Sequence, residues 1–115
     1  MAEYYRFFDS TIDDIREYTA DEYAEYFRMV LTNGIFNGGD NLRVTASGGD
    51  MSVDIIDGYA FINGYLYKVA DGVNLTIETA DTTYDRLDRI VLRWDKRDEN
   101  RFIKAFVKKG VPAEN

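Results

Sequence analysis

One stretch of the chain, Thr19 to Gly34, carries apolar residues at helical spacing. The spacing i, i+3, i+4, i+7 and i+8 predicts an amphipathic helix with a single apolar stripe. Thr19 followed by Glu22 forms a capping-box pattern, which predicts where the helix begins. Asn33-Gly34 predicts that the helix ends at a residue with left-handed backbone angles. Phe27 lies in the middle of the stripe and is expected to anchor the helix in the core. The stripe comprises Tyr23, Tyr26, Phe27, Val30 and Leu31.

Downstream of the helix, short alternating segments are separated by turn signals about every 8 to 12 residues, a spacing typical of antiparallel β architecture. Asn63-Gly64 favours a type I′ turn, because both central residues then need a positive φ. This turn predicts that Ile62 faces Tyr65 and that Tyr59 faces Lys68. Strands are predicted over 42–46, 51–55, 59–62, 65–68, 73–78, 87–94 and 101–109, with turns at 37–40, 47–50, 57–58, 63–64 and 95–100 and a polar connection over 80–84.

The hairpin over 59–68 has apolar residues on both of its faces, so both faces are expected to be covered. We expect the helix to lie against one face, and a second sheet or another subunit against the other. The predicted fold is a β-rich α+β domain: an antiparallel β-sandwich or partly open barrel with one packed N-terminal amphipathic helix. Residues 1–18 form an aromatic lead-in, residues 19–110 the domain, and residues 111–115 the start of a linker to an absent C-terminal region.

The lead-in is rich in aromatic residues but not periodic. Leaving Tyr4, Tyr5, Phe7 and Phe8 in water would cost about 1.5–3 kcal/mol for each large apolar side chain. These four residues are therefore expected to pack on the domain or on a neighbouring subunit, and they are the predicted contact with another subunit or partner. The rest of the lead-in, with Ile12, Ile15 and Tyr18, fits a short helical turn or an extended segment, and the sequence leaves both open.

Charge is distributed unevenly along the 115 residues, whose net charge is −7. Residues 1–57 carry 12 acidic and 4 basic side chains, whereas residues 58–115 carry 9 acidic and 10 basic ones. An acidic half beside a near-neutral half disfavours nucleic acid as a partner. The pattern fits a solvated surface or complementary faces between subunits. Too few consecutive apolar residues occur for a predicted membrane span, so no membrane partner is expected.

The chain contains neither histidine nor cysteine, which excludes Ser-His-Asp and Cys-His nucleophile systems. The carboxylates could in principle supply a glycosidase pair, but 21 acidic residues form close pairs by chance, so we expect no enzymatic activity and no cofactor. Asp50, Asp54 and Asp57 lie near glycines but do not follow the order of a calcium-binding EF-hand loop, so turn formation is the favoured interpretation and no metal is expected.

Basic residues gather on the last predicted hairpin, among Trp94, Phe102 and Phe106. This composition resembles a platform for single-stranded nucleic acid. Interleaved acidic residues favour cross-strand ion pairing on a solvated face instead. Exposed tyrosines can also stack on sugars, which keeps a saccharide site open.

In order along the chain, four sequence blocks resemble the N-terminal module of baseplate or tail-fibre structural proteins of phages and prophages of Gram-positive bacteria. The blocks extend over almost the whole chain, from Phe7 to Ala113. They are Phe7-Phe-Asp-Ser10; Tyr18 to Phe27 with Asn33-Gly-Ile-Phe36; Leu42-Arg-Val-Thr-Ala46 leading through Met51 to Ala60-Phe-Ile-Asn-Gly-Tyr-Leu-Tyr67; and Arg86 to Arg93 with Val107-Lys-Lys-Gly-Val-Pro-Ala113.

The resemblance implies a virion structural protein, made in the bacterial cytoplasm, that docks a fibre or receptor-binding protein on the tail tip or baseplate. It also implies a homo-oligomer, with three copies as the expected number, in contact with other tail proteins. Host saccharide would then be contacted through the absent C-terminal region. A carbohydrate-binding module that touches host cell-wall saccharide itself is the alternative function.

Overall fold

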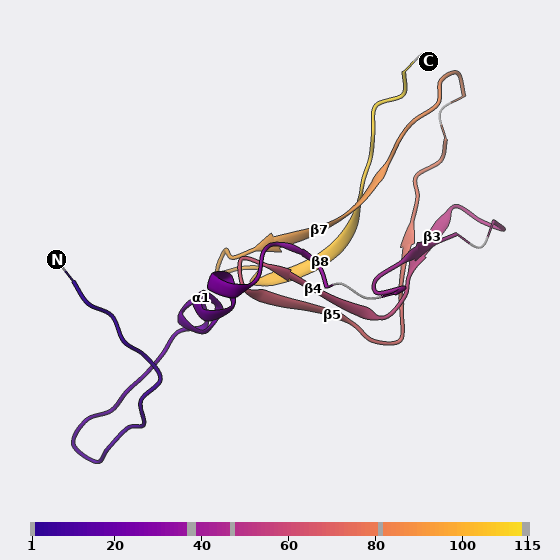
Figure 1. Cartoon of the computed structure of the whole chain (residues 1–115). Helices are drawn as coiled ribbons and strands as arrows, with labels where there is room; N and C mark the ends of the chain where they lie inside the picture. Colours follow the sequence, from indigo (N-terminus) through magenta and orange to yellow (C-terminus); the bar gives the residue numbers. More distant parts are fainter. Residues whose placement is uncertain (1, 37–38, 47, 81, 114–115) are drawn as a thin grey trace.

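The computed structural model describes residues 2–36, 39–46, 48–80 and 82–113. One helix and three antiparallel sheets occur in this part of the chain, in the arrangement shown in Figure 1. The elements are α1 (Ala20–Val30), β1 (Gly34–Ile35), β2 (Val44–Thr45), β3 (Ser52–Ile55), β4 (Gly58–Ile62), β5 (Tyr65–Val69), β6 (Val73–Thr76), β7 (Arg89–Asp95) and β8 (Phe102–Lys108). The sheets have the strand orders β1-β4-β5, β2-β3-β6 and β7-β8.

The start of α1 is as predicted. The Thr19 side chain accepts a hydrogen bond from the Glu22 backbone N–H at 3.2 Å, and the Glu22 carboxylate accepts one from the Thr19 N–H at 3.2 Å. The predicted exit is wrong: α1 ends at Val30, and its C-cap residue Leu31 has extended backbone angles. The Leu31 N–H still donates to the Phe27 carbonyl at 2.8 Å, so the last turn closes without a left-handed residue.

The helix does not cover a face of the β4–β5 hairpin. It lies across the tip of this hairpin, where Arg28 Nη1 donates to the Asn63 carbonyl at 3.0 Å. Ala24, with 4% of its surface exposed, is the one buried helix residue, and Phe27 remains 48% exposed. The prediction that Phe27 anchors the helix in the core is therefore wrong for the single chain. An apolar stripe identifies the helix face that tends to be buried, but it does not identify the surface against which that face packs.

The predicted hairpin over 59–68 has the expected register. In β4–β5, Ile62 lies opposite Tyr65 and Tyr59 opposite Lys68. The turn residues Asn63 and Gly64 have φ values of 49° and 83°, as a type I′ turn requires. In β7–β8, one face carries an apolar set: Ile90, Leu92 and Trp94 opposite Val107, Ala105 and Ile103.

The core lies between the three sheets. Ala60, Tyr67 and Val69 of β4–β5 form a buried cluster with Leu42 and Ile55. The apolar face of β7–β8 packs on this cluster, so the sheets are arranged as in a sandwich and do not close into a barrel. The predicted β-rich α+β class is confirmed.

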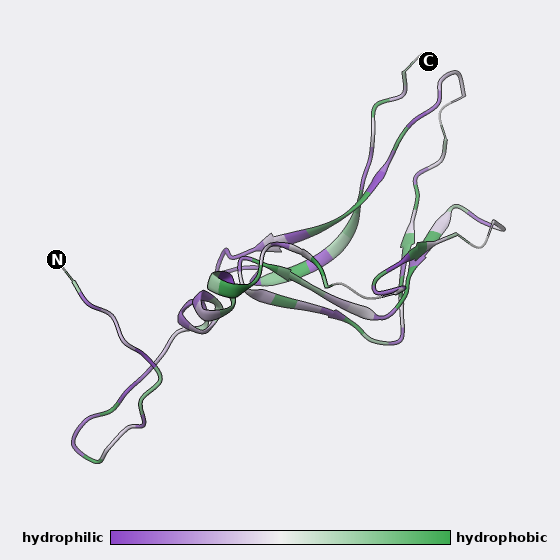
Figure 2. Ribbon diagram, viewed as in Figure 1, coloured by the Kyte–Doolittle hydropathy of each residue, from purple (hydrophilic) through white to green (hydrophobic). Residues whose placement is uncertain are grey.

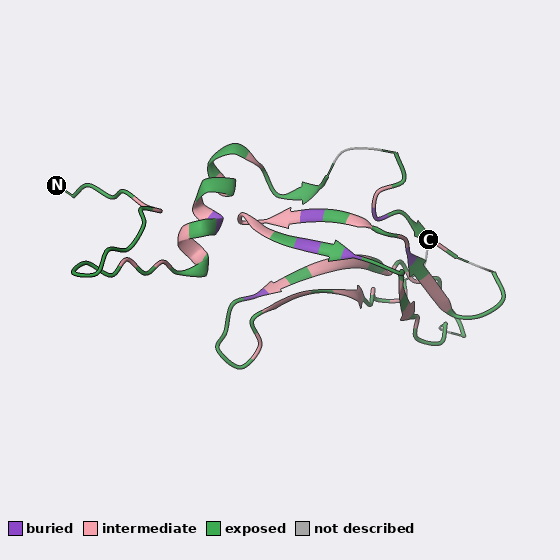
Figure 3. Cartoon of the chain, turned by 90° about the horizontal axis from the view of Figure 1, so that it is seen from below, coloured by how far each residue is buried: buried purple, intermediate pink, exposed green. Residues whose placement is uncertain are grey.

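The molecule is long and open for its mass. Its extents are 68 × 30 × 25 Å and its radius of gyration is 19.7 Å, against about 13 Å for a compact chain of this length. Residues 2–19, the arm, project away from the sheets at one end (Figure 1). Figure 2 shows hydrophobic residues along the arm and helix as well as along the strands, and Figure 3 shows buried positions confined mainly to the strands.

Several predicted connections include residues outside the described part of the chain. They are the turns at 37–40 and 47–50, the connection over 80–84 and the linker over 111–115. Within the described part, the Ala113 N–H donates to the Asp85 carbonyl at 3.1 Å, and the Gly110 N–H donates to Asp88 Oδ1 at 2.8 Å.

Candidate functional site

The arm is an extended segment folded back on itself, which decides between the two conformations that the sequence left open. Thr11 and Asp14 pair across its turn, with N···O distances of 2.9 and 3.3 Å. Nearer the helix, Ser10 Oγ accepts a hydrogen bond from the Arg16 N–H at 2.8 Å. The arm therefore has two limbs, held side by side, that converge on α1.

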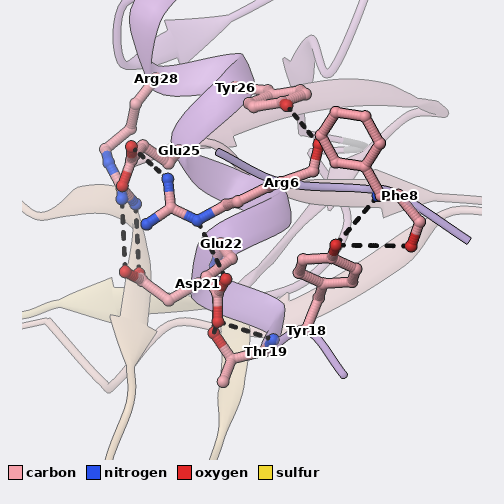
Figure 4. Close-up of polar contacts among 9 residues, drawn as sticks. All are labelled: Arg6, Phe8, Tyr18, Thr19, Asp21, Glu22, Glu25, Tyr26 and Arg28. Atoms are coloured by element: carbon pink, nitrogen blue, oxygen red, sulfur yellow. Dashed lines mark hydrogen bonds and ion pairs between the residues drawn. The ribbon is translucent and has the colours of Figure 1, made fainter. Parts of the chain in front are cut away.

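Arg6 ties the first limb to the helix. Its Nε lies 2.9 Å from Glu22 Oε2, and its Nη1 lies 2.9 Å from Glu25 Oε1 (Figure 4). The pKa of Glu22 lies below its usual range. The largest cause is the hydrogen bond from the Thr19 backbone, and the next is the hydrogen bond from Arg6. Glu25, which is not part of the apolar stripe, is half-buried next to this contact.

Phe7 completes the attachment. Its ring stacks on Tyr23 with centroids 4.4 Å apart, and it lies 4.7 Å from Tyr26 and 4.9 Å from Tyr18. The φ of Phe7 is 70°, which is strained for a bulky side chain. This backbone angle directs the Phe7 ring toward the helix, so two of the stripe residues find a partner in the arm of their own chain.

The four predicted contact residues therefore separate into two groups. Phe7 packs within its own chain, whereas Tyr4, Tyr5 and Phe8 are 78%, 67% and 59% exposed. Tyr5 and Phe8 lie edge to face with ring centroids 6.1 Å apart. The exposed three form an aromatic surface on the arm, and their role as an intermolecular contact stays a prediction.

A second apolar surface lies on the outer face of β4–β5. Phe61 is at its centre, with the Phe27 ring 6.3 Å away and the Phe36 ring 6.4 Å away. Tyr59 and Leu66 extend the surface and are 42% and 54% exposed. The sequence predicted that both faces of this hairpin would be covered, one of them by the helix. In the described part of the single chain the outer face stays largely open, because the helix lies at the hairpin tip.

A pocket of about 520 Å³ opens between the start of α1 and the ends of β5, β7 and β8. The rings of Tyr65 and Trp94 lie 5.5 Å apart inside it. Tyr65 donates its hydroxyl to Asp21 Oδ1 at 3.3 Å, and Lys96 Nζ lies 3.5 Å from the same oxygen. Burial is the main cause that raises the pKa of Tyr65, and the negative charge of Asp21 is the second. The hydrogen bond from Arg28 lowers the pKa of Asp21. Aromatic rings beside a carboxylate and an ammonium suit a small polar ligand.

The outer face of β7–β8 departs from the predicted cross-strand ion pairing. Arg89 lies opposite Lys108, and Arg93 lies opposite Lys104, so cations face cations. Asp88 and Asp95, at the ends of the hairpin, are bound by arginines near them in the sequence instead. Arg86 pairs with Asp88 at 2.8 Å, and Arg97 pairs with Asp95 at 2.6 Å.

The three aspartates considered for calcium each accept a hydrogen bond from a nearby group. Asp50 accepts from the Ser52 hydroxyl at 2.8 Å, Asp54 from the Asn74 amide at 2.7 Å, and Asp57 from the Gly72 N–H at 2.8 Å. Among the described residues, no cluster of three or more acidic side chains has the geometry to bind a metal ion. Nor does the described part of the chain contain a helix long and apolar enough to cross a membrane.

Sequence reasoning missed two of these features. The Arg6 attachment joins residues 16 and 19 positions apart, and no local pattern indicates such a contact. The cationic face had a signal: Arg89 and Arg93, like Lys104 and Lys108, lie four positions apart, so each pair shares a strand face.

Comparison of the chain with protein-family models, curated proteins and solved structures finds no match. The likeness to phage tail proteins therefore rests on the four sequence blocks alone.

Proposed function

We propose that this chain is a structural protein of a phage or prophage virion: an adaptor module that docks a fibre or receptor-binding protein on the tail tip or baseplate. The ordered sequence blocks support the virion assignment. They comprise most of α1 and of the strands β4, β5 and β7, so they coincide with the framework of the domain.

The observation that carries the proposal is the surface that the single chain leaves exposed. Its accessible area is 9246 Å², whereas a compact monomer of 13.3 kDa exposes about 6,450 Å². The difference, roughly 2,800 Å², is of the order that one subunit covers in a ring. Such a subunit contributes about half of the area of each of its two interfaces, and an obligate interface buries about 2,000–5,000 Å² summed over both partners. Large apolar side chains account for part of it, including Ile12 at 95% and Val30 at 75% exposed.

An adaptor needs such surfaces. The exposed aromatic residues of the arm and the open outer face of β4–β5 are available to other subunits, and neither surface is built around a reactive group. Self-association, with three copies as the expected number, follows from the same reasoning, because cyclic homo-oligomers are the usual way to cover large apolar surfaces.

Two measurements test this function. Light scattering and native mass spectrometry on the intact chain, at tens of micromolar, are expected to give one discrete oligomer. A monomer at that concentration would refute an assembly role. The genes that flank the coding sequence are expected to encode tail proteins, and their absence would remove the virion assignment while leaving the oligomer in place.

The pocket at Tyr65 and Trp94 favours a second candidate function, the binding of a host cell-wall saccharide. Aromatic rings can stack on the apolar face of a sugar, while Asp21 and Lys96 can hydrogen-bond its hydroxyl groups. Trp94 is the single tryptophan of the chain, so its fluorescence reports directly on the pocket. Titration with N-acetylglucosamine oligosaccharides should change this fluorescence, and Lys96→Ala should weaken the response. An unchanged spectrum at millimolar sugar would argue against the candidate.

A further inference from the structure

The outer face of β7–β8 combines like charges with apolar residues in a regular order. Arg93 and Lys104 form one cation pair across the strands, and Arg89 and Lys108 form the other. Val91 and Phe106 lie opposite each other between these two pairs. Because the pairs are four residues apart along each strand, they lie about 13 Å apart.

The cations of this face have no carboxylate partner in the ion pairs found among the described residues. The basic residues paired near this hairpin lie at its ends or in its turn: Arg86, Lys96, Arg97 and Lys109. Arg93 instead lies 4.1 Å from the centroid of the Phe106 ring, and Lys104 Nζ lies 4.6 Å from that of Phe102. Like charges directly opposite each other destabilise a strand pair, so an anionic partner on this face would relieve the repulsion.

The arm presents the opposite charge in a similar arrangement. Its two limbs are tied by Ser10 with Arg16 and by Phe8 with Tyr18. Asp9 lies on one limb between these ties, and Glu17 lies on the other. Asp13 follows four residues after Asp9, in the turn.

These three carboxylates are exposed, and they take no part in the ion pairs found among the described residues. Beside them, Ile12 and Ile15 are 95% and 68% exposed. The acidic loop, residues 9–17, thus offers carboxylates in two places about four residues apart, with apolar side chains between them.

We infer that the acidic loop of one copy docks on the outer β7–β8 face of the next copy. The carboxylates face the two cation pairs, and the isoleucines pack on Val91 and Phe106. Within one chain the arm and this face do not meet, because the arm projects away from the sheets (Figure 1). The contact joins two different surfaces, so it is a head-to-tail interface, which closes into a ring when the rotation per subunit allows. This inference rests on the proposed assembly function and specifies the contact that builds it.

Charge reversal tests the contact. The loop variant Asp9→Lys/Asp13→Lys/Glu17→Lys and the face variant Arg89→Glu/Arg93→Glu/Lys104→Glu/Lys108→Glu should each raise the dissociation constant of the oligomer by about 100-fold. A chain that carries both sets of changes should assemble again, because its basic loop meets an acidic face. An equimolar mixture of the two single-set variants should form hetero-oligomers in which contacts join unlike chains, whereas neither variant alone assembles; native mass spectrometry shows both results. A closed ring of three cannot alternate two kinds of chain, so the mixed assemblies should differ in subunit number from the wild type.

Circular dichroism shows whether each variant is folded, and rescue in the mixture requires folded partners. If the multiple variants misfold, the single variant Asp13→Lys, at an exposed turn position, can be tested instead. It should raise the dissociation constant of the oligomer about tenfold. A matched control, Asp98→Lys in the β7–β8 turn, should leave assembly unchanged.

The outcomes separate this inference from the proposed function. If the wild-type chain is oligomeric and both reversed variants assemble equally well, the loop-to-face contact is wrong while the assembly function stands. A monomeric wild-type chain overturns both. Fluorescence anisotropy with a single-stranded oligonucleotide checks the other anionic occupant: tight binding that depends on the four cations, with assembly insensitive to the loop, would overturn the contact in favour of a nucleic-acid face.

Discussion

Gly64 packs against the backbone carbonyl of Ala24, so closely that a β-carbon on residue 64 could not fit. The obstacle is backbone rather than a flexible side chain, and the φ of Gly64 is +83°. The type I′ turn thus needs glycine both for its own geometry and for the helix that lies across it. This contact, together with the Arg28–Asn63 hydrogen bond, sets where α1 lies on the domain.

Gly64→Ala is expected to destabilise the protein by more than about 2 kcal/mol, because backbone strain of about 1–2 kcal/mol adds to the clash. Gly72→Ala is the matched control. Its φ is +73°, yet its β-carbon would meet nothing closer than 3.7 Å, so only the strain remains. Urea denaturation measures both, and equal costs would mean that the helix yields easily at the hairpin tip.

Phe27→Ala is expected to cost about 1–2 kcal/mol in the isolated chain, since the side chain is already half exposed. Ile55→Ala, at a site 4% exposed in the core, should cost about 2–5 kcal/mol. Denaturation at a concentration where the chain is monomeric separates the two. A larger cost for Phe27, appearing only at concentrations where the protein assembles, would place its ring in an interface.

The sequence predicted strands β2 to β8, and the register of the β4–β5 hairpin, because the relevant signals are local. Strand β1 was missed, since it begins at Gly34, where a helix exit was expected. Asn63-Gly64 determines the turn, and alternation determines which residues share a face. The position of α1 was missed because the apolar stripe indicates a face without indicating a partner. The stripe residue Tyr23 packs on Phe7 of the arm. The backbone of Phe7 has a positive φ, which a sequence pattern does not predict for phenylalanine. The surfaces proposed for assembly follow from this open arrangement of the arm and helix.

Acid should destabilise the β7–β8 hairpin through Asp95. Hydrogen bonds from the Arg97 side chain and backbone N–H, then from Asn100, hold the pKa of Asp95 well below its usual range. A carboxylate whose pKa is lower in the folded state than in the unfolded state stabilises the fold at pH values above its unfolded-state pKa, about 4 for aspartate. This stabilisation is lost as the pH falls below about 4. Asp95→Asn should therefore lower the Tm at pH 7, and its difference from wild type should shrink between pH 5 and about pH 2.

Asp98→Asn, an exposed position in the same turn, serves as the control and should follow the wild-type pH profile. The wild-type slope should not vanish in Asp95→Asn, because hydrogen bonds from Arg86 and the Gly110 N–H also lower the pKa of Asp88. A constant Tm difference across the whole pH range would show that Asp95 acts through packing rather than through its charge.

Metal ions should leave the stability unchanged. Asp50, Asp54 and Asp57 are each engaged by a neighbouring donor, so none of them needs a cation as a partner. Melting curves with calcium, with zinc and with a chelator are expected to coincide, since a ligand of the native state raises the Tm. A rise of several degrees with calcium would point to these three residues first.

The arm should respond differently to the loss of Phe7 and of Phe8. Phe7 stacks among three tyrosines of its own chain, whereas Phe8 is 59% exposed. Phe7→Ala should release the arm from α1, seen as about tenfold faster proteolysis between residues 8 and 18, because local opening then becomes less costly. Phe8→Ala should leave the proteolysis of the monomer unchanged and weaken only the oligomer, measured by light scattering. If Phe8→Ala also loosens the arm in the monomer, the exposed aromatic surface is part of the fold of the arm rather than a contact with another molecule.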